Sequence, residues 1–197
     1  MKILKYLIIL ALVYYAFQTY MNSKWVPLGS EGIITEEPRQ EYTEEEPFQH
    51  KDYRIIPRKT FYLEARVLSK RQYRNGREAQ LAPVDLALGW GPMSDDTVLK
   101  DIKITQSNRW YHFKYRLPPP IAKKEIIRHS SNMHLIPASN TVLNQIKKVR
   151  PGQVVELEGY LVSVRAEDGW SWNSSLSHTD TGDGACEVVW VEDFYIY

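Results

Sequence analysis

The pattern of hydrophobic and polar positions divides the chain into three stretches. Residues 1–21 open with lysines and continue as an uninterrupted apolar run from Tyr6 to Phe17. Residues 22–53 carry few apolar side chains, whereas residues 54–197 alternate apolar and polar positions over much of their length. We therefore expect an N-terminal membrane segment, a linker and one folded domain, with boundaries at these positions.

The N-terminal stretch has the charged start and apolar core of a secretory signal or of a signal anchor. The apolar core of about twelve residues is typical of a signal peptide, since a membrane span needs roughly twenty. However, bulky residues such as Tyr20 stand where a cleavage site needs small ones, and Lys5 can snorkel, which allows a span from Ile3 to Met21. We expect an uncleaved anchor, with a cleaved signal as the alternative. Lysines precede the span and glutamates follow it, which predicts a single-pass inner-membrane protein with its N-terminus inside and a periplasmic domain.

Residues 22–53 are rich in glutamate and contain several prolines. Such a segment repels itself and buries too little apolar surface to fold alone. We expect a solvated acidic spacer that holds the domain away from the membrane. A docking segment for a partner is the alternative.

Period-two alternation predicts β-strands in the domain. Strands are expected over residues 61–67, 81–88, 102–104, 109–115, 154–164, 170–176 and 186–197. Turn signals at Asn75-Gly76 and Asp168-Gly169 join neighbouring strands into hairpins. A short helix is expected over residues 141–149 after a cap at Ser139-Asn140, and residues 121–137 are expected to be irregular.

The stretch from Arg150 to Val164 combines a Pro-Gly turn with an alternating strand that carries a glycine at its middle. This stretch, and the order of three strands, a helix and two strands, resembles the OB-fold, a small Greek-key barrel. The resemblance implies a mainly β domain with one short helix between strands 3 and 4. Residues 129–137 and 180–186 also resemble a family of membrane-anchored bacterial envelope proteins, a resemblance that implies no particular activity.

Composition limits the chemistry. The net charge of +1 argues against a strongly polyanionic partner. Cys186 is the only cysteine, which excludes an internal disulfide, and its position beside an apolar strand favours a buried, inert thiol. No zinc-type spacing accompanies the histidines, so we expect neither a metal nor a cofactor.

Several side chains are nevertheless candidates for binding. They are His129, Asn132, His134, Trp90, Trp170, Trp172, Arg71 and Arg74. The polar residues can hydrogen-bond a ligand, the tryptophans can stack on a sugar ring or plug the barrel, and the arginines can neutralise phosphates. The candidate contact surface combines a loop over residues 128–136, a turn over 89–92 and a loop over 177–184.

The preferred interpretation is a non-catalytic binding or scaffolding module of a cell-envelope assembly, with an envelope protein as its partner. One alternative is an envelope enzyme in which Cys186 is the nucleophile and His129, His134 or His178 is the base, because a thiolate needs a base within hydrogen-bond reach. Another is an OB domain that binds single-stranded nucleic acid, although nucleic acid is not the expected partner outside the inner membrane. A low pKa of the Cys186 thiol would favour the enzyme, and strongly salt-dependent binding to single strands would favour the nucleic-acid-binding domain.

Overall fold

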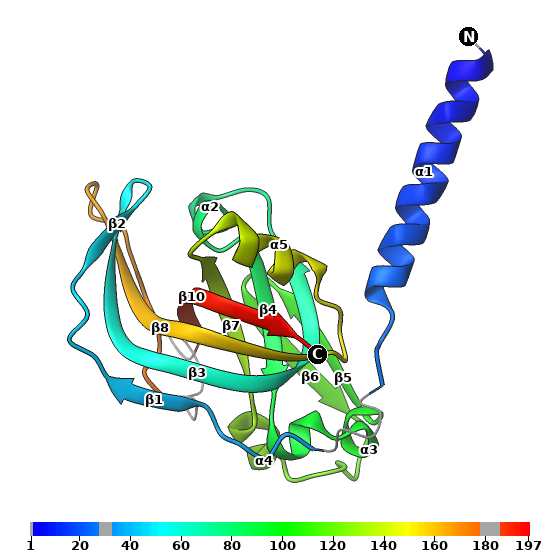
Figure 1. Ribbon diagram of the computed structural model, residues 1–197. Helices are drawn as coiled ribbons and strands as arrows, with labels where there is room; N and C mark the ends of the chain where they lie inside the picture. The colour runs from blue at the N-terminus through cyan, green and yellow to red at the C-terminus, as the bar shows by residue number, and fades with distance from the viewer. Residues whose placement is uncertain (1, 28–32, 178–185) are drawn as a thin grey trace.

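The computed structural model describes residues 2–27, 33–177 and 186–197, and it consists of one long helix, α1 (Lys2–Ser23), and a body rich in β-strands (Figure 1). The strands are β1 (Arg39–Tyr42), β2 (Phe48–His50), β3 (Tyr53–Gln72), β4 (Val84–Gly89), β5 (Ile102–Ser107), β6 (Trp110–Tyr115), β7 (Ser130–Pro137), β8 (Val154–Ala166), β9 (Ser171–Asn173) and β10 (Glu187–Ile196). The short helices are α2 (Arg77–Leu81), η1 (Gly91–Ser94, a 3-10 helix), α3 (Asp96–Leu99), α4 (Lys123–Arg128) and α5 (Asn140–Lys148). The prediction of a mainly β body is confirmed.

The main sheet closes on itself. Its strands follow the order β1-β3-β4-β7-β10-β8-β9, and an additional pairing joins β3 to β8. As a result β3, β4, β7, β10 and β8 form a ring-like sheet (Figure 1). The β3–β8 pair is antiparallel, whereas β7 and β10 are parallel and therefore need a long crossover connection between them. The chain supplies this crossover with α5, β8 and β9.

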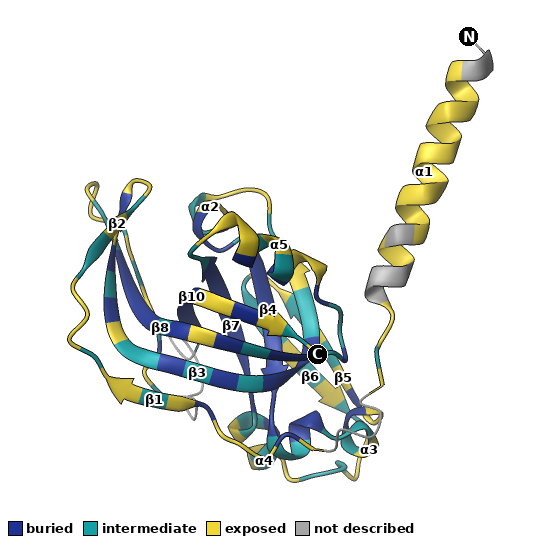
Figure 2. Ribbon diagram, in the orientation of Figure 1, coloured by how far each residue is buried: buried dark blue, intermediate teal, exposed yellow. Residues whose placement is uncertain are grey.

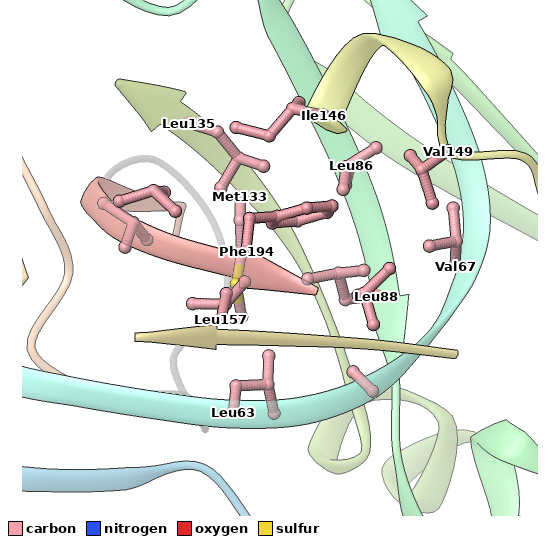
Figure 3. Packing of buried hydrophobic residues seen from close by; sticks show 14 of the residues in the cluster. Leu63, Val67, Leu86, Leu88, Met133, Leu135, Ile146, Val149, Leu157 and Phe194 are labelled. Carbon is pink, nitrogen blue, oxygen red and sulfur yellow. The ribbon is translucent and has the colours of Figure 1, made fainter. Parts of the chain in front are cut away.

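An apolar core fills the interior of the ring (Figure 3). Leu63 on β3, Leu86 on β4 and Phe194 on β10 are among its members, and each is almost completely buried. Helix α5 adds Ile146 to this core. Its N-cap is Ser139, whose Oγ accepts a hydrogen bond from the backbone N of Val142 at 3.2 Å. The predicted helix is confirmed, with both of its ends one residue earlier than expected.

Strands β5 and β6 form a separate hairpin that packs on the outside of the ring. One face of the hairpin is apolar, and Ile102, Tyr111 and Phe113 on that face join a second apolar cluster with Leu68 and Ala87 of the ring. The other face of the hairpin is exposed (Figure 2). The predicted hairpin is therefore confirmed, and its apolar face is what attaches it to β3 and β4.

Residues 33–53, expected to be part of a solvated spacer, belong to the folded body instead. Strand β1 pairs antiparallel with the middle of β3, and β2 pairs with its beginning. Ile34 is buried in the main core and its carbonyl accepts a hydrogen bond from Gly91 N at 2.6 Å. The physical reason is that an added edge strand needs mainly backbone hydrogen bonds, so acidic side chains that stay exposed do not prevent it.

Two further local predictions are wrong. Residues 121–137, expected to be irregular, contain α4 and β7. Strand β7 has both faces covered, one by the core and one by the β5–β6 hairpin, so its sequence lacks the alternation that marks a half-buried strand. The strand expected over residues 81–88 begins only at Val84, because α2 occupies the residues before it.

Helix α1 stands away from the body and exposes its described apolar side chains (Figure 2). Leu7, Ile8 and Leu12 are all more than half exposed. Over the described residues, none of the helices combines the length and the apolar character that crossing a membrane requires.

Candidate functional site

A buried cluster of polar side chains lies where the tip of the β5–β6 hairpin meets β4 and β7. Asp85 on β4 and His134 on β7 are directly opposite in the antiparallel register, and His134 Nδ1 lies 3.0 Å from Asp85 Oδ2. Arg109, in the hairpin turn, places Nη1 2.6 Å from Asp85 Oδ1 and also donates to the carbonyl of Ala82 at 2.9 Å. Asp85 is completely buried, so the guanidinium supplies the countercharge that a buried carboxylate needs.

Two aromatic rings hold Arg109 in place. Its guanidinium carbon lies 3.9 Å from the ring centroid of Tyr73 and 5.7 Å from that of Trp172. The Tyr73 hydroxyl accepts a hydrogen bond from the backbone N of Arg109 at 3.1 Å. Asn108 and Arg109 both adopt positive φ angles, 50° and 68°, as a tight two-residue turn between strands requires. This turn therefore directs the arginine toward β4.

Asn132 connects the same turn to β7. Its Nδ2 donates to the Arg109 carbonyl at 3.0 Å, and its Oδ1 accepts from Gln106 Nε2 at 2.7 Å. Because Asn132 is 1% exposed and both ends of its amide are occupied, it fixes the hairpin rather than presenting itself to a ligand.

The thiol of Cys186 lies at the edge of this cluster, 3.9 Å from the Arg109 carbonyl. Burial, and next the negative charge of Glu187, raise the pKa of Cys186 to about 12. The thiol is therefore protonated at neutral pH, and nucleophilic catalysis requires a thiolate. The ring of His134 contacts Asp85 and lies tilted by 41° against the ring of Trp172, with a centroid separation of 4.9 Å.

The other histidine candidates lie elsewhere. His129 follows α4, where its Nδ1 is 2.9 Å from the Glu125 carbonyl oxygen and 3.6 Å from Glu125 Oε2. His178 lies outside the described residues, as does most of the expected 177–184 loop. The structure thus brings Asn132, His134 and Cys186 into one region and places His129 just before the start of β7, at the end of α4.

The remaining predicted binding residues do not form a common surface. Trp90 is completely buried in the main core. Trp170 is half-buried beside Tyr53, with ring centroids 5.7 Å apart. Arg71 and Arg74 are exposed at the end of β3. Of the expected 128–136 contact loop, residues 128 and 129 end α4 and the rest form the buried strand β7, whose polar residues bond within the fold.

Sequence reasoning missed Asp85 and Arg109. One signal was available for Asp85: it is the single charged residue of an otherwise apolar strand, and a charge in such a strand needs a partner. Nothing in the local sequence identifies Arg109 as this partner, because the contact depends on where the hairpin folds back.

A second arginine joins the body to the residues that follow α1. The guanidinium of Arg66 donates to the Val26 carbonyl and to Asp96 Oδ1, both at 2.9 Å, and to the Gly152 carbonyl at 3.0 Å. The ring of Trp25 covers this guanidinium at 4.7 Å, and Trp25 Nε1 donates to Asp96 Oδ1 at 3.0 Å. The segment directly after α1 is therefore fixed to the body.

Two pockets open beside this junction. The first has a volume of about 600 Å³ and is lined mainly by apolar side chains, among them Trp25, Leu68, Leu99 and Ile104. The second, of about 750 Å³, lies along the β5–β6 hairpin, and its lining includes the basic side chains of Lys100, Lys103, Lys114 and Arg116. Lys100 and Ile102 line both pockets, so the two are adjacent.

Within the described part of the chain, no group of three or more His, Cys, Asp or Glu side chains is arranged to hold a metal ion. Comparisons with protein-family models, with curated proteins and with solved structures find no match for this chain. Function is therefore argued from the geometry.

Proposed function

We propose that the protein is a membrane-anchored, non-catalytic binding module of a cell-envelope assembly. In this proposal α1 is the anchor, the body lies outside the cytoplasm, and the ring-like sheet is an OB-type Greek-key barrel. The proposal is carried by one observation: an exposed apolar helix is joined, through the contact of Trp25 with Arg66, to a compact folded body.

The strand order supports the OB-type assignment. Counted along the chain, β3, β4, β7, β8 and β10 are the first to fifth strands of the ring, and their spatial order is first, second, third, fifth, fourth. Helix α5 lies between the third and the fourth of them. A five-stranded Greek-key ring with a helix at this point fits the OB-type architecture.

The exposed apolar face of α1 supports the membrane assignment. Burial of apolar surface stabilises by about 25 cal/mol per Å², so side chains such as Leu7 and Leu12 favour insertion into a bilayer over contact with water. The basic residues before the apolar run favour an N-terminus in the cytoplasm.

The buried polar cluster argues against both alternative functions. OB-folds bind oligonucleotides on the face of their second and third strands, which correspond here to β4 and β7. In this protein the β5–β6 hairpin covers that face. Arg109 forms an ion pair with Asp85, and Trp172 contacts Arg109 and His134. The raised pKa of Cys186 argues against a cysteine nucleophile.

We assign the contact with an envelope protein to the free edge strand β1. It begins the strand order of the main sheet, and Tyr42 at its end is 81% exposed. An exposed edge offers unpaired backbone groups to which a partner can add a strand.

The test of anchoring uses the full chain expressed in a bacterial host. We expect the protein to stay in the membrane pellet after a high-pH carbonate wash, and a Leu7→Asp/Leu12→Asp variant to be released by that wash. A Tyr195→Asp variant, which changes an exposed apolar residue of the body, is the matched control and should stay in the pellet. Recovery of the unaltered protein in the soluble fraction would contradict the proposal.

A further inference from the structure

The exposed face of the β5–β6 hairpin carries like charges that lie directly opposite one another. Lys103 and Lys114 are paired in the antiparallel register, and both are exposed. Like charges at opposing positions destabilise a strand pair. Lys100 and Arg116 line the same pocket of about 750 Å³, whose lining contains one acidic residue, Asp101.

No described acidic side chain neutralises these four basic residues through an ion pair. An arrangement that concentrates positive charge in a pocket, against its own stability, fits the binding of an anion. Phosphate groups are anions of this kind, and lysine and arginine are the side chains that bind them.

The neighbouring pocket adds an apolar requirement. Because Lys100 and Ile102 line both pockets, a ligand can occupy the basic and the apolar pocket together. Each volume is within the usual range of small-molecule sites. A ligand that matches both has an anionic head and an apolar chain.

The position of the two pockets favours a membrane lipid as their ligand. Trp25, which lines the apolar pocket, is two residues beyond the end of α1. Leu117, next to Arg116 in the chain, is 85% exposed, so an apolar side chain projects beside the basic pocket. Basic residues next to exposed apolar ones are typical of contact with an anionic bilayer surface.

We propose that these two pockets bind one anionic phospholipid of the membrane in which α1 is anchored. The phosphate-bearing headgroup contacts Lys103, Lys114 and Arg116, and an acyl chain enters the apolar pocket beside Trp25. This inference rests on the proposed membrane placement of α1, and it goes beyond that placement by naming a ligand and its site.

The test uses the full chain in nonionic detergent micelles, titrated with phosphatidylglycerol that carries bromine on its acyl chains. Bromine quenches tryptophan fluorescence at short range, so saturable quenching that is largely lost in a Trp25→Phe variant is expected. Phosphatidylcholine with the same brominated chains should bind more weakly, because its headgroup has no net charge. Equal quenching curves for the two lipids would overturn the headgroup site.

The charge requirement is tested with a Lys103→Gln/Lys114→Gln variant. We expect its affinity for phosphatidylglycerol to fall about thirtyfold, since each basic residue near an anionic lipid contributes a few-fold to binding. Its melting temperature should rise, because the repulsion between the two lysines is removed. A Lys123→Gln/Lys124→Gln variant removes the same charge from exposed positions of α4 and should change neither quantity appreciably.

Two further results would overturn the inference. One is an unchanged affinity in the Lys103→Gln/Lys114→Gln variant. The other is displacement of the lipid by a single-stranded oligonucleotide, which would make the basic pocket a nucleic-acid surface. Carbonate extraction of the same variants reports on α1 separately. Failure of lipid binding by a protein that resists extraction overturns the lipid site alone, whereas a protein that is soluble without detergent overturns the anchor.

Discussion

Arg109, at the tip of the β5–β6 hairpin, places its Nη1 2.6 Å from Oδ1 of Asp85, on the ring strand β4. The hairpin is a separate two-stranded sheet, and among the described strands none is hydrogen-bonded to it from the ring. Apolar contacts of Ile102 and Phe113 attach its body, and this ion pair attaches its tip. Together with the hydrogen bonds of Asn132 to the Arg109 carbonyl and to Gln106, this ion pair holds the tip over β4 and β7.

Replacing Arg109 by Met should lower the free energy of unfolding by about 3 kcal/mol, because it leaves the buried Asp85 without its countercharge. Urea unfolding followed by circular dichroism measures this loss. Arg116→Met is the control: it removes an equal charge from the same hairpin at an exposed position, and its effect should stay within about 0.5 kcal/mol. Equal losses in the two variants would show that the ion pair does not hold the tip.

The thiol of Cys186 should react very slowly in the folded protein. Its pKa of about 12, against 9.0 for an ordinary thiol, lowers the thiolate fraction at pH 7.5 roughly a thousandfold. Alkylation with iodoacetamide, followed by mass spectrometry, measures the rate. The urea-unfolded chain is the control and should be labelled at the rate of a free thiol. Fast labelling of the folded protein at neutral pH would show that Cys186 is a reactive thiol and would support the enzyme hypothesis.

The same shift of the Cys186 pKa makes stability depend on pH in the alkaline range. The folded state holds the proton more tightly than the unfolded state, so this contribution is fully present below about pH 9 and is lost as the pH rises toward 12. A Cys186→Ala variant should lose less free energy of unfolding than the unaltered protein over this interval. Parallel curves for the two proteins would contradict the assigned pKa.

The contact between the body and the segment after α1 depends on Gly152. Its φ is +90°, and a Cβ at this position would lie 2.1 Å from the carbonyl oxygen of Val26. Gly169 has nearly the same φ, +87°, but open space where its Cβ would be. Both Gly→Ala variants therefore carry similar backbone strain, and only Gly152→Ala also displaces Val26.

We expect Gly152→Ala, and not Gly169→Ala, to release the segment from the body. Limited proteolysis should then cut near Lys24 at least several times faster, since Trp25 no longer covers Arg66. If the two variants are cleaved at the same rate, the segment is not held by this close contact.

Local patterns predicted the elements whose environment differs between their two faces. The β5–β6 hairpin and α5 are amphipathic, and the Asp168-Gly169 turn lies between the β8 and β9 strands that it was expected to join. Gly159, the glycine in the middle of the predicted 154–164 strand, stands beside a register shift between β8 and β10, where a Cβ would meet the Trp190 carbonyl at 1.9 Å. In these places the local sequence was enough to predict the element, although distant contacts complete its environment.

The errors lie where distant segments decide the environment. Strand β7 has no exposed face, and β1 is held by backbone bonds to β3, so neither displays an alternation that marks a strand. The cluster around Asp85 was missed for a related reason. Asn132 and His134 were recognised as unusual polar residues, but the hairpin that buries them comes from an earlier part of the chain.

The central claim is that α1 anchors the body outside the cytoplasm, and reporter fusions after Tyr197 test it most directly. Alkaline phosphatase, which is active only after export, and green fluorescent protein, which is fluorescent only when it folds in the cytoplasm, are fused in turn to the full chain in a bacterial host. The account predicts an active phosphatase fusion in the membrane fraction and a dark fluorescent-protein fusion. A fluorescent fusion together with an inactive phosphatase would place the body in the cytoplasm and contradict the account.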